Sequence, residues 1–256
     1  MIPIADDNSG RTIRPAINWL LIAANVFAFV VLQGLGTNER FTYAFATVPA
    51  EIATGQGIAR SVTIRDPVSG ETVGRIDLQP PPVSVYWTLL TSMFLHGGLG
   101  HLLGNMLYLY IFGDNVEDAL GHGRYLFFFL TCGLLASLSH VIATFVSGSN
   151  PYLPSLGASG AISGVLAAYV SLFPARRVRV LMFVFVMDVP AIVVLGLWFV
   201  FQLVNGVGML GAGSQAGGVA YAAHIGGFAA GFLLIRRFTL RVPAFGRSAR
   251  FATGGR

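Results

Sequence analysis

The segment "GASGAISG" (Gly157–Gly164) places a serine, Ser159, among three glycines within a long apolar stretch. Gly160 and Gly164 are four residues apart, which is the small-xxx-small spacing that lets two membrane helices pack closely. Ser159 is therefore either a small residue at a helix contact, hydrogen-bonded to its own backbone, or a nucleophile. The rest of the sequence indicates which residues surround this serine, and these residues decide between the two interpretations.

The composition indicates an integral membrane protein. Of 256 residues, 54% are hydrophobic and 11% are charged, and the mean hydropathy is +0.70. A soluble domain of this length is much more polar. The net charge of +5 comes from sixteen basic residues, all arginine, many of which lie beside apolar runs. This placement points to the lipid bilayer as a partner and not to nucleic acid.

A membrane-spanning helix needs about 20 mainly apolar residues. Six segments come close to this length: 16–35, 92–112, 124–147, 157–173, 190–207 and 217–235. We therefore expect an all-α polytopic membrane protein with six transmembrane helices in the region 16–235. The first segment lacks an obvious small-residue cleavage site, so we expect it to be a retained span and not a signal peptide.

The arginines predict the orientation of these spans. They flank the first, third, fourth and sixth spans on one side, whereas the connections 148–156 and 208–216 carry no charge. By the positive-inside rule both the N-terminal segment 1–15 and the basic tail 236–256 are cytosolic. We expect a bacterial inner (plasma) membrane, with a large outer loop, 36–91, between the first two spans.

Two connections have patterns of their own. Within the outer loop, "SVTIRDPVSGETVGRIDL" (61–78) alternates Val and Ile with polar residues around a turn, which predicts a β-hairpin. Farther along, "MDVPAIVV" places Asp188 two residues before Pro190, which predicts a helix N-cap followed by a first-turn proline. The preceding "RVRVLMFVFVM" is then an interfacial connection, and Asp188 lies outside the membrane.

Polar residues of three spans share one depth. His101 and Asn105 are four apart and so lie on one helical face. Ser159 opens the fourth span, and His224 lies about 10 Å from the outer end of the sixth. Each residue alone has an ordinary structural interpretation, such as a packing contact or a helix-to-helix hydrogen bond. Their common depth indicates a single site.

A hydroxyl and an imidazole at one depth suit nucleophilic acyl transfer. A neutral histidine can take the proton of a serine hydroxyl, and backbone or side-chain N–H groups can stabilise the resulting oxyanion. No carboxylate is available to orient His224, so a dyad is implied. Gly227 and Gly231 have the same small-xxx-small spacing and would bring the sixth span against the fourth.

These stretches resemble the rhomboid family of intramembrane serine proteases, from about Phe41 to Leu234. The resemblance rests on four stretches taken together: "TLLTSMFLHGGLGHLLGNMLYLYIFGDNVEDALG", "GASGAISG", "VPAIVVLGLWFVFQLVNG" and "AAHIGGFAAG". It implies a six-helix rhomboid-like bundle and an endopeptidase that cleaves transmembrane protein substrates in or near their membrane segments, without cofactor or metal. It does not specify the oligomeric state.

The resemblance also implies roles for single residues. Ser159 would be the nucleophile and His224 the general base. His101, Asn105 and Gly157, with the Ser159 amide, would form the oxyanion and substrate-binding site. Outside this site, Glu117, Gly121 and Arg124 resemble the structural pattern that the family has after the second span. Trp198 and Gln202 resemble residues of the span that flanks the substrate entry.

Two positions depart from the family pattern. The frequent Trp-Arg pair of the outer loop is Trp87-Thr88 here. Some rhomboids carry a tyrosine four residues after the nucleophile, stacked on the histidine, but this chain has Ser163. The sequence therefore leaves open what holds the imidazole of His224 in place.

Other classes of protein fit the sequence less well. An inactive rhomboid-like protein typically lacks the serine or the histidine, and both are present. A channel or transporter would more naturally carry paired intramembrane carboxylates or an internal repeat. A metalloprotease would need His-Glu-x-x-His or similar spacing, and an aspartyl intramembrane protease would need two acids in the spans. Neither is found.

Overall fold

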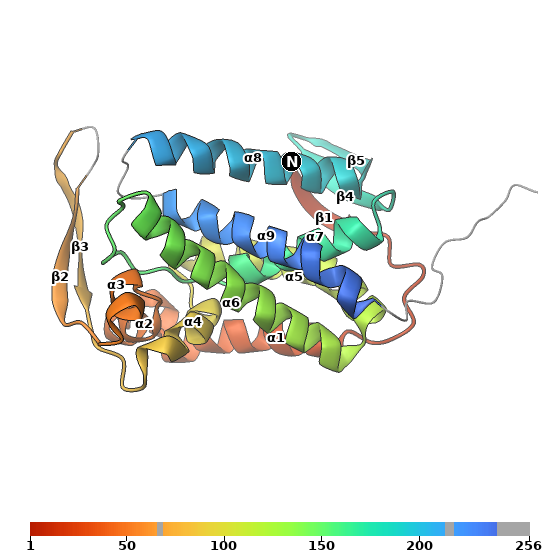
Figure 1. The fold of residues 1–256 in the computed structure, drawn as a ribbon. Helices are drawn as coiled ribbons and strands as arrows, with labels where there is room; N and C mark the ends of the chain where they lie inside the picture. Colours follow the sequence, from red (N-terminus) through yellow and green to blue (C-terminus); the bar gives the residue numbers. More distant parts are fainter. Residues whose placement is uncertain (66–68, 213–217, 240–256) are drawn as a thin grey trace, which may run out of the picture.

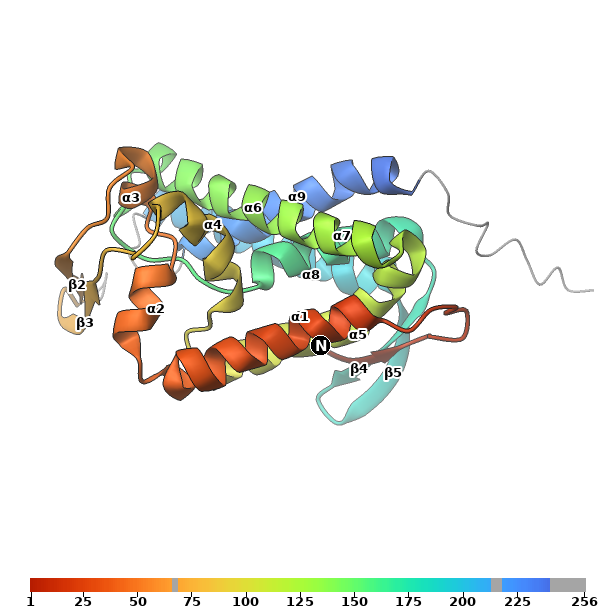
Figure 2. The ribbon, with the colours of Figure 1, turned by 90° about the horizontal axis from the view of Figure 1, so that it is seen from below.

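The computed structural model describes residues 1–65, 69–212 and 218–239. Within these residues, six long helices run side by side along the molecule (Figures 1 and 2). Each overlaps one of the segments predicted as spans: α1 (Ala16–Phe27), α5 (Leu99–Leu120), α6 (His122–Val146), α7 (Ser159–Leu172), α8 (Ala191–Ala212) and α9 (Gly218–Phe238). The predicted tail beyond residue 239 lies outside the described residues.

The boundaries of the second segment were predicted wrongly. The helix α5 begins at Leu99 and not at residue 92, and it continues to Leu120. Before it, the chain forms α4 (Thr88–Thr91), a 3-10 turn over Ser92–Phe94 and a loop through Gly97 and Gly98. The run 92–98 is apolar enough to be counted as the start of a span, but paired glycines favour a loop over a helix.

Apolar length varies among these helices. Among the described residues, α6 alone combines the length and the apolar composition needed to cross a membrane. Four other apolar helical stretches are shorter: Ala16–Leu32, Val85–Phe94, Ser159–Leu172 and Ala191–Asn205. The helix α5 is 22 residues long but carries three acidic residues in its last two turns. The number of membrane crossings therefore stays a prediction.

The helix α7 lies at the centre of the bundle, against α5, α6 and α9. Its residues from Gly160 to Tyr169 are all buried. A helix that is covered on every side must be apolar or small all round, and "SGAISGVLAAYVSL" meets this requirement. Ser159, at its first residue, is therefore held by the most enclosed element of the described chain.

Glycines bring α7 and α9 into backbone contact. A Cβ atom on Gly227 would overlap the carbonyl oxygen of Gly160, and one on Gly231 would overlap that of Gly164. The prediction that these glycines join the fourth and sixth segments is confirmed. In a membrane, such close backbone approach is a main source of helix association because van der Waals packing replaces the hydrophobic effect.

The chain is mostly helical, as predicted, but two small antiparallel sheets flank the bundle, and only one of them, the hairpin of the outer loop, was expected (Figure 1). At one end, β1 (Ile2–Asp6), β4 (Arg177–Met182) and β5 (Phe185–Pro190) pair in the order β1-β4-β5. At the other end, β2 (Arg60–Arg65) and β3 (Thr72–Leu78) form a hairpin where the sequence predicts one. Beside it lie the short helices α2 (Glu39–Phe45) and α3 (Pro49–Thr54).

Asp188 is a strand residue and not a helix N-cap. It faces Arg179 across the β4–β5 pair, with Nε–Oδ1 and Nη2–Oδ2 distances of 2.9 and 3.3 Å. The helix α8 begins at Ala191 instead, and the Ala191 N–H donates to the Arg176 carbonyl at 2.8 Å. The aspartate-proline pattern misled because β-branched and aromatic residues here favour a hairpin. Asp188 is exposed.

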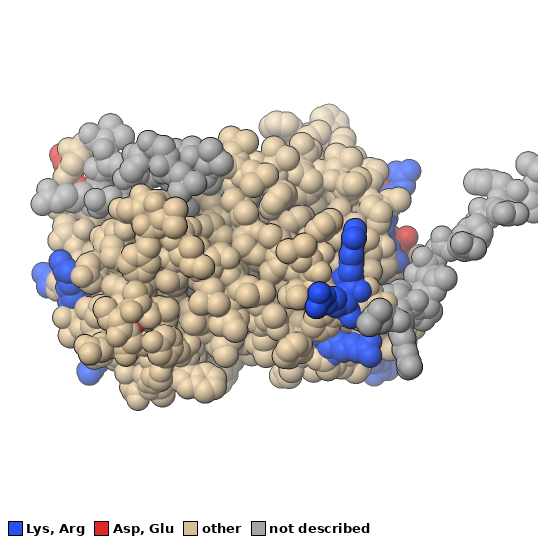
Figure 3. All heavy atoms as spheres, viewed as in Figure 1, with Lys and Arg blue, Asp and Glu red and all other residues tan. Residues whose placement is uncertain are grey.

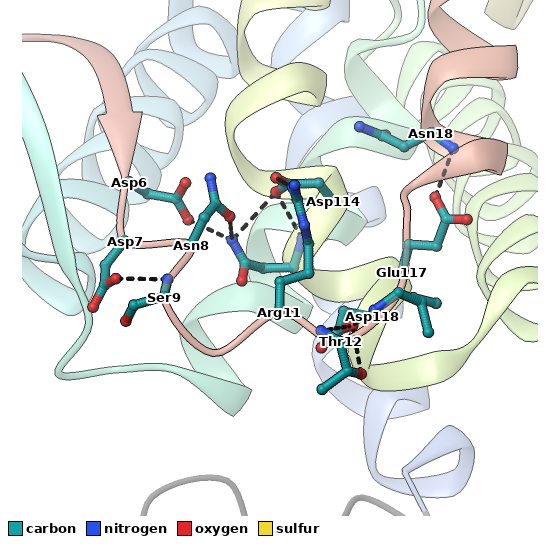
Figure 4. A network of polar contacts seen from close by, with 12 residues as sticks. Asp6, Asp7, Asn8, Ser9, Arg11, Thr12, Asn18, Asp114, Glu117 and Asp118 are labelled. Carbon is teal, nitrogen blue, oxygen red and sulfur yellow. Dashed lines mark hydrogen bonds and ion pairs between the residues drawn. The ribbon is translucent and has the colours of Figure 1, made fainter.

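A polar network ties the N-terminal segment to the end of α5 (Figure 4). Glu117 is fully buried and accepts hydrogen bonds from the Ile17 and Asn18 N–H groups at 2.9 and 2.7 Å. It thus satisfies N–H groups in the first turn of α1 that lack helical partners. Arg11 pairs with Asp114 in the same network. These contacts fix α1 against α5.

Charge is distributed toward the ends of the bundle. On the face shown in Figure 3, the blue arginines gather at both ends, and the band between them, over the middle of the helices, shows neither sign of charge. A band of this kind is what lipid tails require, since isolated charges in hydrocarbon are costly.

A side chain at Gly227 should separate α9 from α7. Gly227→Ala would place a methyl group on the Gly160 carbonyl, and overpacking of this kind costs about 1–3 kcal/mol. We expect a lower thermal unfolding midpoint in detergent micelles. Gly196→Ala is the matched control, because a Cβ there meets nothing within 4 Å. Equal midpoints for both variants would contradict the contact.

The stability of the N-terminal segment should depend on pH through Asp6. Burial raises the pKa of Asp6 to about 6, above about 4 for an exposed aspartate. The folded state therefore binds this proton more tightly, and the stability it contributes is lost as pH rises through about 6. Through Asp6, we expect the thermal unfolding midpoint of the protein to be higher at pH 5 than at pH 7.5.

The variant Asp6→Asn mimics the protonated side chain, so it should reduce the difference between the two midpoints. Asp7→Asn is the control, because a hydrogen bond from Ser9 lowers the pKa of Asp7 and this neighbour stays ionised across the interval. An unchanged difference in Asp6→Asn would refute the role of Asp6.

Candidate active site

Ser159 is held at the N-terminal end of α7 by an ordered connection. The preceding Gly157 has φ +126°, a conformation that glycine adopts readily and other residues rarely do. Its N–H donates to the Ser92 carbonyl at 2.9 Å, and Thr47 and Ser155 exchange backbone hydrogen bonds at 2.9 and 2.8 Å. The backbone that leads into Ser159 is therefore anchored to two other segments.

The side chains of Ser159 and His224 meet between α7 and α9. The Nε2 atom of His224 lies 2.8 Å from the Ser159 Oγ atom, within the range in which a histidine can take a hydroxyl proton. The two glycine contacts described above bring these helices together, and Gly160 and Gly227 lie next to the pair along their helices. The predicted nucleophile and base are thus adjacent.

His101 and Asn105 converge on the same place from α5. A Cβ atom built on Gly157 would lie 2.9 Å from the His101 Nε2 and 3.7 Å from the Asn105 Nδ2. The Gly97 N–H approaches the other ring nitrogen, Nδ1, at 3.5 Å. The Asn105 Nδ2 is buried and makes no hydrogen bond within the described residues. An unpaired buried donor is costly, and here it faces the site.

The expected part of Gly157 in oxyanion binding does not fit its geometry. Its N–H is already used by the Ser92 carbonyl, so this amide is not free to donate to an oxyanion. A Cβ at this position would lie 2.7 Å from the His101 Cε1. Gly157 therefore makes room for the imidazole of His101 rather than offering a donor.

A small cavity adjoins the serine. It has a volume of about 30 Å³ and contacts Ser159 and His224. Three further serines are among the residues that line it: Ser92, Ser137 and Ser155. A polar cavity of this size can hold a water molecule, so the site has room for one beside the nucleophile.

The residue that holds the second nitrogen of His224 was not predicted from the sequence. The Gln202 Oε1 atom on α8 lies 2.8 Å from the His224 Nδ1. Trp198, one turn earlier, packs its ring 6.0 Å from the imidazole. Ser163 is not involved, since its hydroxyl donates to the Ser159 carbonyl at 2.7 Å. The spacing of Trp198 and Gln202 indicated that they share a helix face, but it did not indicate that this face packs against His224.

Among the described residues, no group of three or more His, Cys, Asp or Glu side chains is placed so that it could hold a metal ion. The chemistry available at the site is that of a hydroxyl, two imidazoles and two amides. Such a set can transfer a proton and donate hydrogen bonds to a developing negative charge.

The sequence model of the rhomboid domain matches residues 83–240, which include Ser159, His224, His101 and Asn105. The chain belongs to the rhomboid family. It is therefore an integral membrane protein. The sheet strands β1, β2 and β3 lie before the matched rhomboid domain, whereas β4 and β5 lie inside it.

Several rhomboids resemble the chain. It is 31% identical over 238 residues to rhomboid protease GluP of Bacillus subtilis, a match that covers 91% of this chain and 37% of that protein. It is 33% identical over 156 residues to rhomboid protein 1, mitochondrial, of Saccharomyces cerevisiae, covering 61% and 43%. The human presenilin-associated rhomboid-like protein, mitochondrial, is 33% identical over 93 residues, covering 36% and 24%. The matches thus span less than half of these relatives.

Proposed function

We propose that this rhomboid is a serine endopeptidase that cleaves transmembrane proteins in or near their membrane segments. The observation that carries the proposal is the 2.8 Å contact between the Ser159 Oγ and the His224 Nε2. It joins two helices in the interior of an apolar bundle, where a hydroxyl and an imidazole would otherwise be costly to place. The relative from Bacillus subtilis is itself named a rhomboid protease.

In the first half of the reaction, the His224 Nε2 takes the proton of Ser159 as the Oγ attacks the carbonyl carbon of the peptide bond. The bond between carbonyl carbon and nitrogen then breaks. The protonated imidazole gives its proton to the leaving amine. An acyl group remains on the Ser159 Oγ.

The tetrahedral intermediate carries a negative oxygen that needs donors. The Asn105 Nδ2 and the His101 Nε2 face the backbone before Ser159, and the Ser159 amide lies at the start of α7, where the helix dipole favours negative charge. Because these groups are held in place before the reaction, they stabilise the oxyanion without reorganisation.

Water must reach the acyl group to complete the reaction. The cavity beside Ser159, which three further serines line, provides a place for one water molecule. His224 would take a proton from that water, which attacks the acyl carbon, and return the proton to Ser159. Both halves of the reaction thus use one base.

We also propose six membrane crossings with both termini in the cytosol of a bacterial cell. The long helices that support this proposal are those named above, and the end of the bundle with β1, β4 and β5 carries Arg11, Arg176, Arg177 and Arg179. An excess of arginine at one end fits the cytosolic side. The hairpin of β2 and β3 would then lie outside.

Covalent labelling with a fluorophosphonate tests the nucleophile and the base. The wild-type protein in detergent or liposomes should be labelled, and Ser159→Ala should not be. His224→Ala should lose labelling because the hydroxyl then has no base. Ser163→Ala is the matched control and should be labelled normally, since its hydroxyl bonds only to the Ser159 carbonyl. Equal labelling of Ser159→Ala and wild type would refute the proposal.

Asn105→Ala should slow the reaction without abolishing it. Loss of one donor to an oxyanion lowers the rate about 10²–10³-fold, and the phosphonyl oxygen of the probe takes the place of the carbonyl oxygen. The measurement is the labelling rate, with Asn205→Ala as control because the Asn205 Nδ2 donates to the Phe201 carbonyl of its own helix. A wild-type rate in Asn105→Ala would remove Asn105 from the site.

A further inference from the structure

An imidazole that acts as a base at Nε2 must carry its proton at Nδ1. Neutral histidine exists in two tautomers, and which nitrogen is protonated is set by the hydrogen bond that the other one makes. If the proton were on Nε2, His224 would donate to the Ser159 hydroxyl and could not take its proton. A serine–histidine pair alone leaves this choice open.

The surroundings of His224 offer an acceptor at Nδ1. The Gln202 side chain is 6% exposed, and its Oε1 lies 2.8 Å from this nitrogen. Among the described residues, the ring forms hydrogen bonds to Gln202 and Ser159, one on each nitrogen. The three side chains thus form a continuous chain of hydrogen bonds across α8, α9 and α7.

We propose that Gln202 is a positioning residue that holds His224 in its reactive tautomer. Its Oε1 accepts the Nδ1 proton and leaves the Nε2 lone pair directed at the Ser159 hydroxyl. The inference rests on the proposed function and adds a third member to the pair. The role corresponds to that of the third residue in a catalytic triad, which orients the base.

An amide differs from a carboxylate in what it can do for the base. A carboxylate both orients an imidazole and stabilises its protonated form, whereas the neutral Gln202 orients it only. The titratable groups that face the ring are His101 from α5 and Tyr221 from α9, whose ring centroid is 6.4 Å away. No described carboxylate is hydrogen-bonded or ion-paired to His224. A neutral acceptor avoids the cost of a buried charge.

The support for the imidazole comes from one face of α8. Trp198 and Gln202 are four residues apart, so both side chains project from the same side of the helix. The indole packs at 6.0 Å and 39° to the imidazole, while the amide holds Nδ1. Together they restrict the ring in place of the tyrosine that some rhomboids carry after the nucleophile. The position of α8 against α9 therefore sets the state of the base.

The test compares fluorophosphonate labelling rates of three variants across pH. Gln202→Met removes the acceptor at similar volume and should slow labelling about 10–100-fold, as loss of an orienting partner does at other imidazoles. Gln202→Glu keeps an oxygen at Nδ1 and should label at least tenfold faster than Gln202→Met at high pH. Its half-maximal labelling should move to higher pH, because the carboxylate stabilises the protonated ring. Asn205→Met is the control and should label as wild type.

The tautomer of His224 can also be measured directly in the wild type, which keeps the proposal testable if a variant does not fold. Nitrogen-15 NMR of histidine-labelled protein, with the signal of His224 assigned by its absence in His224→Ala, should show the proton on Nδ1 in the wild type. A proton on Nε2 would overturn the inference. So would wild-type labelling by folded Gln202→Met, or a Gln202→Glu profile identical to that of Gln202→Met. Failure of the wild type to label would instead refute the proposed function.

Discussion

The close approach of α7 and α9 at paired glycines is the constraint on which the site depends. Gly160 directly follows Ser159, and Gly227 lies three residues after His224. The same backbone contact that packs the two helices therefore fixes the distance between hydroxyl and imidazole. Lipid does not drive helices together as water does, so the contact has to be close to be stable. In this bundle, helix packing and the geometry of the Ser159–His224 pair depend on one feature.

The polar groups at the end of α5 serve a different purpose. Glu117 is fully buried, where an isolated carboxylate would be costly, and its Oε1 lies 2.5 Å from the His122 Nδ1. Besides this imidazole, two N–H groups and the N-terminal end of the α1 dipole stabilise it. The Asn18 side chain adds bonds to the Leu109 carbonyl and the Tyr125 hydroxyl at 2.9 and 2.7 Å. Contacts of Asn18 and Glu117 thus hold α1, α5 and α6 together.

The sequence alone predicted the residues of the site that share a depth, because a helix converts spacing into position. Ser159, His224, His101 and Asn105 were found in this way. The partner of His224 was not found, because whether Gln202 reaches it depends on how α8 lies against α9. Asp188 was misplaced because a capping pattern and a strand compete there. The pairing of β1 with β4 joins segments more than 170 residues apart, and no local pattern encodes it.

The order of the site residues along the chain has a consequence for biosynthesis. Ser159 precedes His224 by 65 positions, and chains grow at about 5–20 residues per second, so His224 is added roughly 3–13 s after Ser159. During that interval the hydroxyl lacks the His224 imidazole, and on the proposed function it would react as an ordinary serine. On the proposed function, the incomplete chain would not cleave other proteins that enter the bilayer next to it, and it would become reactive only when α9 packs.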